Sequence, residues 1–207
     1  MHQQLFPSRE GLGVCFLKYT FIQFSMTKRL FDLFFAVFGL LFFSQIILLL
    51  YVLATIDTKQ NGFFLQQRIG RFGKPFTIYK LRTYGISAAQ PVSKFGTFLR
   101  NSKLDELPQL FNVFLGQMSF VGPRPDIAGY YDTLKGENRK ILELKPGLTS
   151  LASIKYANED EVLLKQNNPL EYNDTIIFPD KVKMNLEYYY TNSIFDDIKI
   201  IWNTLFR

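Results

Sequence analysis

An uncharged stretch of 24 residues near the N-terminus, from Leu33 to Ile56, limits what this chain of 207 residues can fold into. A helix needs about 20 apolar residues to cross the hydrocarbon core of a bilayer, so this stretch is long enough for membrane insertion. Helices on the surface of globular proteins are apolar on one face only. The sequence therefore predicts a membrane helix over residues 28–57. Residues 1–27 match no known pattern and are assigned to an N-terminal extension.

Positive charges flank this stretch on both sides. Lys28 and Arg29 precede it, and these basic residues follow it: Arg68, Arg71, Lys74, Lys80 and Arg82. Cytoplasmic flanks are rich in such charges, so both ends are expected on the cytoplasmic side. A helix that enters the membrane and returns satisfies this expectation, whereas a single span does not. Ser44 and Gln45 mark the expected break, because Ser44 can bond back to a helix carbonyl and Gln45 is costly in lipid.

The composition narrows the chemistry that this chain can perform. Its net charge of +6 favours an anionic partner, such as a phosphate ligand or a membrane surface. Cys15 and His2 are the only cysteine and histidine, which argues against an internal disulfide, a zinc site and a Ser-His or Cys-His catalytic pair. The basic residues are scattered among carboxylates and no nucleic-acid motif occurs, so we expect no nucleic-acid partner. Carboxylates, lysines and arginines must then carry any catalysis.

Residues 95–126 hold most of the candidate site residues. Asp105 and Glu106 are adjacent carboxylates, Arg100 precedes them, and Arg124 follows in a rigid turn between two prolines. Asp105 stands where a helix N-cap is expected, and a helix N-terminus binds anions through its free N–H groups. Arg100 and Arg124 can fork onto phosphate oxygens there. A capping aspartate and solvated arginines are the plain alternative, but the combination within about 25 residues favours a phosphate site.

Two short segments rich in Phe, Ile, Thr and Tyr, over residues 63–69 and 76–83, are separated by glycines and a proline and are expected to form a β-hairpin. Lys80 and Arg82 fall on one face of the second strand, where they can bind a phosphate or simply be solvated. Residues 151–156 are expected to form a further strand.

Two helical segments carry apolar faces. The first follows Asp105 and is expected to be buried through these residues: Leu107, Leu110, Phe111, Phe114 and Leu115. The second covers residues 193–207, with Asp196, Asp197, Lys199 and Asn203 opposite these apolar residues: Ile194, Phe195, Ile198, Ile201, Trp202, Leu205 and Phe206. Core packing and membrane contact both explain the second face, and Trp202 and Phe206 favour a helix at the membrane interface.

From about residue 28 to the C-terminus, the chain resembles the bacterial sugar transferases, the monotopic phosphoglycosyl transferases that start lipid-linked glycan assembly. The resemblance rests on Leu99-Arg100, Ser102, Leu104-Asp105-Glu106-Leu107-Pro108-Gln109, Asn112-Val113, Gly116, Met118-Ser119 and Val121-Gly122-Pro123-Arg124-Pro125. It implies an α+β fold in which a re-entrant or spanning membrane helix precedes a small, mostly helical cytoplasmic catalytic domain with a short β-hairpin, here residues 58–207. The family breaks its membrane helix at a Ser-Pro pair, and Ser44-Gln45 lacks that proline.

The resemblance implies that a sugar-1-phosphate passes from a nucleotide sugar, with UDP as the expected nucleotide, to a polyprenyl phosphate through a covalent aspartyl-phosphosugar. This step would initiate a lipid-linked glycan such as capsule, exopolysaccharide, O-antigen or glycoprotein. Asp105 and Glu106 are the implied catalytic residues and the ligands for Mg²⁺, which neutralises the diphosphate. The implied substrate-binding residues are Lys80, Arg82, Arg100, Pro123, Arg124 and Pro125.

We therefore expect a protein of the bacterial inner (cytoplasmic) membrane, with its catalytic domain on the cytoplasmic face. Its expected partners are the nucleotide-sugar donor, the polyprenyl phosphate acceptor and membrane lipid, and a homo-oligomer is left open. The alternative is a catalytically idle, membrane-anchored partner of a polysaccharide-assembly complex. The intact acidic and arginine residues count against this alternative, and the missing proline after Ser44 counts for it. No motif identifies the sugar.

Overall fold

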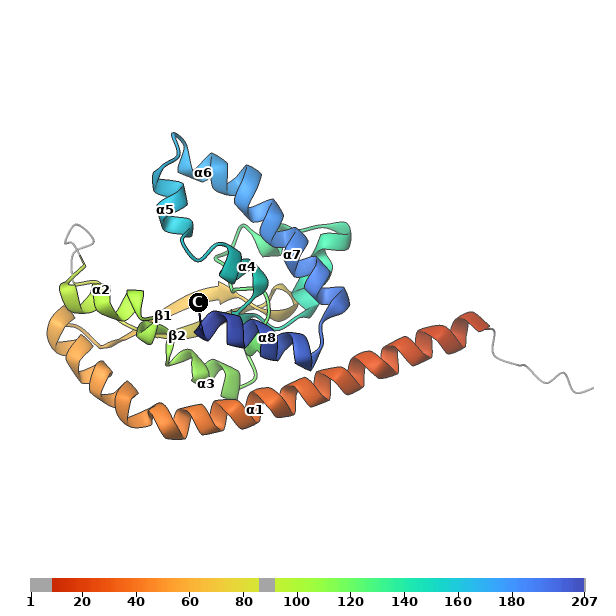
Figure 1. Cartoon of the computed structure of the whole chain (residues 1–207), viewed down its shortest axis with the longest axis horizontal. Coiled ribbons are helices and arrows are strands. Elements are labelled where there is room, and N and C mark those ends of the chain that lie inside the picture. Colours follow the sequence, from red (N-terminus) through yellow and green to blue (C-terminus); the bar gives the residue numbers. More distant parts are fainter. Residues whose placement is uncertain (1–8, 86–91, 207) are drawn as a thin grey trace, which may run out of the picture.

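The computed structural model describes residues 9–85 and 92–206, with side chains described from Met26 onward. A long helix, α1 (Arg9–Thr58), lies beneath a small domain of short helices and strands (Figure 1). The helix is not straight, because its C-terminal part curves around the side of the domain and leads into the first strand. The predicted mixture of helices and strands after an N-terminal apolar helix is confirmed.

The predicted hairpin forms from β1 (Phe63–Ile69) and β2 (Pro75–Leu81), which pair antiparallel. The one-turn helix η1 (Arg71–Gly73) connects the two strands. In β2, the side chains of Ile78 and Leu81 are buried in two different hydrophobic clusters. The hairpin is thereby fixed on the domain through its second strand.

Short helices follow the hairpin: α2 (Lys94–Asn101), η2 (Leu104–Glu106) and α3 (Gln109–Phe114). The prediction that Asp105 caps a helix is wrong, because Asp105 lies inside the one-turn helix η2 and α3 begins only at Gln109. Pro108 stands at the N-cap of α3 and has no N–H to leave unsatisfied. The anion site predicted at this helix N-terminus therefore has no counterpart in α3.

Two short parallel strands, β3 (Ser119–Val121) and β4 (Gly147–Thr149), bring distant segments together. The backbones approach so closely that a Cβ on Gly122 would lie 2.3 Å from the carbonyl oxygen of Lys145. A Cβ on Gly147 would lie 2.2 Å from the backbone nitrogen of Gly122. Glycine is therefore required on both sides of this approach, directly before the diproline turn.

The C-terminal half is built from short helices and two long ones. Its elements are η3 (Tyr131–Thr133), η4 (Gly136–Glu143), α4 (Leu151–Lys155), α5 (Glu159–Leu164), α6 (Pro169–Tyr172), η5 (Asn173–Ile177), α7 (Phe178–Thr191) and α8 (Ile194–Leu205). The predicted strand over residues 151–156 is wrong, because these residues begin as helix α4. Ser150 caps this helix by accepting a hydrogen bond from the Ser153 N–H at 3.0 Å, which favours helix over strand.

Helix α1 contributes to the core of the domain at two places. Ala36 is fully buried in a cluster with Ile78 and Met118. Further along, Leu50 packs in a second cluster with Leu81 and Leu99. The apolar helix is therefore part of the folded domain and not a separate anchor beside it.

Polar contacts tie the start of the apolar segment to the last helix. Lys28 forms an ion pair with Asp197 of α8, and the Tyr188 hydroxyl donates to the same carboxylate at 2.5 Å. Asp197 is fully buried, so its predicted place on the solvated face of the helix is wrong. The pattern of α8 is misleading here, because a charged residue packs inward when a cation from another element meets it.

Large apolar side chains remain exposed on three helices. On α3 and at its C-cap, Phe111, Phe114 and Leu115 are exposed, although the sequence predicts that they are buried. On α8 and at its C-cap, the exposed residues are Phe195, Ile198, Trp202, Leu205 and Phe206, so core packing does not explain most of this face. Within the described residues, one helix, Met26–Thr58, is long and apolar enough to cross a membrane. An apolar surface of this extent is typical of membrane or partner contact.

Candidate active site

Three charged side chains from distant parts of the chain meet at the edge of a cavity. Glu106 Oε1 accepts hydrogen bonds from Lys80 Nζ at 3.1 Å and from Arg124 Nη2 at 2.5 Å, and Glu106 Oε2 lies 3.4 Å from Arg124 Nη1. Burial raises the pKa of Glu106, but Arg124 and Lys80 outweigh burial and lower this pKa to about 2. Glu106 therefore stays ionised and holds two cations on one carboxylate.

Asn112 fixes α3 against β2 and thereby places Glu106 beside Lys80. The Asn112 side chain is fully buried, and its Nδ2 donates to the Thr77 carbonyl at 2.7 Å. Its Oδ1 accepts the Tyr79 N–H at 3.1 Å. A buried amide whose donor and acceptor are both satisfied specifies one arrangement of the two elements. The sequence pattern does not reveal this role, because polar residues on a helix are usually solvated.

The turn that carries Arg124 is held by the two parallel strands. The Gly122 N–H donates to the Thr149 carbonyl at 3.0 Å, and the Gly147 N–H donates to the Pro123 carbonyl at 2.9 Å. The proline rings fix φ on both sides of Arg124. Arg124 is 47% exposed, so it can meet a ligand while it remains paired with its carboxylate.

Helix α1 supports both elements that flank this group. Arg29 Nη1 donates to the Val113 carbonyl at 2.6 Å, at the C-terminal end of α3, where a cation is favourable. Asp32 accepts hydrogen bonds from the Ser119 hydroxyl at 3.0 Å and the Phe120 N–H at 3.1 Å, both in β3. The apolar helix thus contacts the helix that follows the carboxylates and the strand that precedes the arginine.

Asp105 lies next to Glu106, with its side chain buried and its Oδ1 without a hydrogen-bond partner among the described residues. Burial raises the pKa of Asp105, and the neighbouring negative charge of Glu106 raises it further. An ionised oxygen without a partner is costly in the protein interior. This carboxylate is therefore the least satisfied acidic group of the site, and it is available to a cation or an electrophile.

A cavity of about 940 Å³ lies beside these residues, which is a size typical of small-molecule sites. Lys80, Lys103, Glu106, Arg124 and Pro125 contribute to its lining. Asp105 is not part of the lining, although both Lys103 and Glu106 are. The buried Asp105 carboxylate is therefore set back from the cavity surface, beside Glu106.

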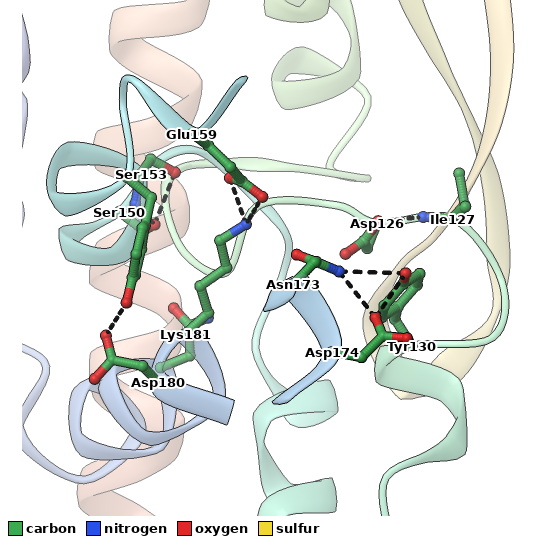
Figure 2. Close-up of polar contacts among 12 residues, drawn as sticks. Asp126, Ile127, Tyr130, Ser150, Ser153, Glu159, Asn173, Asp174, Asp180 and Lys181 are labelled. Carbon is green, nitrogen blue, oxygen red and sulfur yellow. Dashed lines mark hydrogen bonds and ion pairs between the residues drawn. The ribbon is translucent and has the colours of Figure 1, made fainter. Parts of the chain in front are cut away.

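Another part of the cavity wall comes from the C-terminal half, and Figure 2 shows its polar residues. The Tyr130 hydroxyl accepts from Asn173 Nδ2 at 3.3 Å and donates to Asp174 at 3.1 Å. Lys181 pairs with Glu159 at 2.6 Å. Asn173 begins the π-helical turn η5, a feature common at functional sites. No local motif marks these residues, so sequence reasoning misses them.

Three of the predicted substrate-binding residues do not line the cavity. Arg82 Nε donates to the Asn61 carbonyl at 2.8 Å, and the Arg100 guanidinium bonds to the Tyr84 hydroxyl. Pro123 is buried inside the turn. The structure thus separates the two strand cations that the sequence places on one face, and it does not bring Arg100 into the cavity lining.

The predicted break of the membrane helix lies at Ser44 and Gln45, and α1 continues through both residues. The Ser44 hydroxyl donates to the Leu41 carbonyl at 3.0 Å, a type of contact that often bends helices. Figure 1 shows the helix curving without interruption. Re-entry into the membrane therefore stays a prediction, with a curved helix as its structural basis.

The acidic residues suit a magnesium ion that a phosphate ligand helps to hold. Within the described residues, no group of three His, Cys, Asp or Glu side chains could hold a metal on its own. Magnesium is commonly bound by one or two carboxylates together with ligand phosphates and water. Asp105 Oδ1 is free for such a contact, whereas both oxygens of Glu106 face cations.

Comparison with known proteins places these observations in a family. The bacterial sugar transferase family matches residues 23–207. The chain is 33% identical over 195 residues to UDP-glucose:undecaprenyl-phosphate glucose-1-phosphate transferase of Klebsiella pneumoniae, which covers 87% of this chain but 39% of that protein. It is 34% identical over 187 residues to an uncharacterized sugar transferase of Bacillus subtilis, covering 86% of this chain and 85% of that protein.

A further relative is the putative undecaprenyl-phosphate N-acetylgalactosaminyl 1-phosphate transferase of Bacillus subtilis. It is 36% identical over 121 residues, which cover 53% of this chain and 68% of that protein. The names of these relatives include different sugars. The family match covers the apolar helix, the paired carboxylates and the diproline turn alike. The chain belongs to the bacterial sugar transferase family.

Proposed function

We propose that this protein transfers a sugar-1-phosphate from a nucleotide diphosphate sugar to a polyprenyl phosphate at a membrane surface, and so initiates a lipid-linked glycan. The named relatives support the general reaction, because their names combine undecaprenyl phosphate with a sugar-1-phosphate. UDP is the proposed nucleotide, after the UDP-glucose in the name of the Klebsiella protein. The sugar is left unassigned, since relatives with different sugars match the same chain.

One observation carries this proposal. Asp105, with a free carboxylate oxygen, lies directly beside a carboxylate that holds two cations at the edge of a cavity. A diphosphate needs cations around its oxygens, and a carboxylate oxygen that no hydrogen bond holds is free to attack phosphorus. Lys80 and Arg124 supply the cations, and Glu106 keeps both of them in place.

The proposed reaction has two displacement steps. In the first, an Asp105 oxygen forms a bond to the sugar-bearing phosphorus, while the bond from that phosphorus to the bridging oxygen breaks and nucleoside monophosphate leaves. In the second, an oxygen of polyprenyl phosphate attacks the same phosphorus, and the bond to Asp105 breaks. The products are a polyprenyl diphosphate sugar and the regenerated carboxylate, so no oxidant or reductant is required.

Magnesium is the proposed cofactor. When bound, it neutralises the negative charge of the diphosphate, which lowers the repulsion that an attacking carboxylate meets. Asp105 or Glu106 would provide its protein ligand. Lys80 and Arg124 orient the remaining phosphate oxygens, and Arg124 can bind two of them at once because of its forked shape.

The proposed setting is the cytoplasmic face of the bacterial inner membrane. Lys28 at one end of the apolar segment is bonded to α8, and Asp57 at the other end accepts a hydrogen bond from Ser93 at 2.6 Å. One folded domain cannot lie on both sides of a bilayer, so contact of both ends with it supports a re-entrant helix. This arrangement holds the site at the depth where the head group of a lipid acceptor lies.

The test is release of UMP by membrane fractions over a panel of UDP-sugars, with and without polyprenyl phosphate. Asp105→Asn should abolish turnover and labelling of the protein by a donor labelled in its sugar phosphate. The matched control is Asp196→Asn on α8, a half-exposed aspartate outside the cavity lining, which should retain both. Full labelling of Asp105→Asn would reassign the nucleophile, and no release by the wild type with any donor would favour the idle partner.

A further inference from the structure

The cations that line the cavity differ in one respect. Four of them lie within 4 Å of a carboxylate, as Arg68–Asp126, Lys80–Glu106, Arg124–Glu106 and Lys181–Glu159 pairs. The fifth, Lys103, also lines the cavity and forms no ion pair within 4 Å among the described residues, although its charge favours the ionised form of nearby Asp105. The Lys103 side chain is exposed, so its ammonium group is accessible to a ligand that enters the cavity.

The backbone of Lys103 makes its identity notable. Lys103 follows the C-cap residue Ser102 of α2 and has a φ of 57°, in the left-handed region. At this position after a helix, glycine is the usual residue and asparagine the next, because a longer side chain is strained there. A lysine in this conformation gains nothing in backbone energy over asparagine. The backbone conformation therefore does not account for a lysine at this position.

The charges around Lys103 indicate what a lysine can contribute here. Lys80, Arg124 and Glu106 together carry one positive charge, and ionised Asp105 cancels it. Without Lys103, this end of the cavity is thus neutral before a diphosphate arrives. Lys103 lies two residues before Asp105 in the chain, and it leaves this group of charges with a net positive charge for an incoming phosphate.

We propose that Lys103 is a phosphate-binding residue of this site, whose ammonium group binds a phosphate oxygen that enters the cavity. This inference rests on the proposed function. The oxygen belongs either to the diphosphate of the donor or to the phosphate of the lipid acceptor, and the shared chemistry is a phosphate anion. A lysine suits this task because its ammonium carries three donors on a flexible stem and can follow the phosphate as it moves.

A purely structural role has a different signature. A cation near a helix C-terminus stabilises the helix through its dipole, and this effect would be lost in any uncharged variant. Asparagine, in contrast, tolerates the left-handed conformation better than lysine. If Lys103 serves ligand binding, Lys103→Asn should lose activity without losing thermal stability, and Lys103→Arg should recover most of the activity.

The chain offers a matched control. Lys59 follows the end of α1, is exposed and has a φ of 54°, so it shares the backbone conformation of Lys103. Lys59 does not line the cavity. Lys59→Asn therefore makes the same chemical change in the same conformation, and it should leave the rates of donor cleavage and of transfer to the acceptor at the wild-type value.

The experiment measures the two half-reactions separately for full-length protein in nanodiscs. UMP release from donor alone, in single turnover, reports the donor phosphate, and decay of the labelled protein with polyprenyl phosphate reports the acceptor phosphate. Loss of a charge-assisted contact should slow at least one of these by about tenfold or more in Lys103→Asn. The half-reaction that slows shows whether Lys103 binds the phosphate of the donor or that of the acceptor. Wild-type rates in both would overturn the proposal, as would an equal loss in Lys59→Asn.

A binding measurement keeps this inference separate from the proposed function. Inorganic pyrophosphate should raise the melting temperature of the wild type and of Lys59→Asn, and it should raise that of Lys103→Asn clearly less. Failure of the wild type to release UMP, with this difference intact, would reject the transfer reaction but not the phosphate site. Equal shifts in all three proteins would reject the role of Lys103.

Discussion

Lys28, before the apolar segment, is ion-paired with Asp197 in the last helix, 169 residues away. The side chain of Asp197 is fully buried, and that of Lys28 is 14% exposed. Removing one partner of such a pair leaves the other charge without compensation. The pair therefore joins the start of the apolar segment to the last helix, and its loss should lower the stability of the protein.

Asp197→Asn should lower the free energy of unfolding by about 3 kcal/mol or more. The amide can still accept from Tyr188, so the loss reports the charge and not the hydrogen bond. Thermal unfolding in detergent micelles measures the difference. Asp196→Asn, a change at the next residue where the side chain is 46% exposed, should cost less than about 1 kcal/mol. Equal melting temperatures for the two variants would contradict this prediction.

Glu106 should make the free energy of unfolding depend on pH in the acidic range. Its pKa is lowered from 4.5 to about 2 in the folded protein, so its ion pairs contribute fully above the pKa of the unfolded state. This contribution, up to about 3 kcal/mol, is lost as the pH falls through 4.5 toward 2. Wild type and Glu106→Gln should therefore differ in stability at pH 6 and converge near pH 2. A stability difference between wild type and Glu106→Gln that does not change with pH would show that the ion pairs of Glu106 are not its cause.

Asp105 should change stability with pH in the direction opposite to Glu106. Its pKa is raised in the folded protein, so its ionisation destabilises the fold as the pH rises above the unfolded value of 3.8. Asp105→Asn should therefore unfold at a higher temperature than wild type at pH 7, with a gain on the order of 1 kcal/mol. The gain should vanish at pH 3. A variant that is both inactive and less stable at pH 7 would show that Asp105 stabilises the fold.

Removal of divalent cations should stop the reaction. Because the cavity offers few free carboxylates, the metal depends on substrate phosphate and should bind the free protein weakly. Dialysis against EDTA should therefore reduce UMP release by about 100-fold or more, and added Mg²⁺ should restore it. The melting temperature without substrate should hardly change. Full activity after exhaustive chelation would reject the metal requirement.

The course of the apolar helix can be tested by thiol labelling. Thr27 and Lys59 are both exposed in the structure and bracket the apolar segment, so each can carry a single cysteine in a Cys15→Ser background. Thr58 is a poorer choice because it is buried. Both cysteines should resist an impermeant reagent in spheroplasts and react after lysis. Reaction of Thr27→Cys alone before lysis would indicate a full span.

Local patterns predict the elements whose partners are close in the sequence. The hairpin and the apolar helix follow from short runs of residue types, and the structure contains both. The pattern fails for Asp197, because its partner is Lys28 and no local signal announces a cation from so far away. It also fails for Phe111 and Phe114, because helical spacing does not say whether an apolar face meets the core or stays exposed.

The residues of the candidate site likewise fall into those that a local motif predicts and those that only the structure reveals. Asp105, Glu106 and Arg124 lie in one short stretch, so a motif marks them. Asn112 acts through a strand, and Tyr130 and Asn173 reach the cavity from separate elements. Their contribution depends on tertiary packing, which sequence spacing does not encode. Lys103 is marked by its backbone conformation, which appears only in the structure.

The packing of α1 has a practical consequence for preparing this protein. Ala36 and Ala54 are completely inaccessible to solvent, and Leu50 is nearly so. Cutting the chain after the apolar segment to obtain a water-soluble fragment would strip these side chains from the core and expose the surfaces beneath them. Such a fragment would be expected to aggregate. Solubilising changes belong instead on the outward side of the helix, at positions such as Leu41 and Phe42, where side chains touch little of the protein.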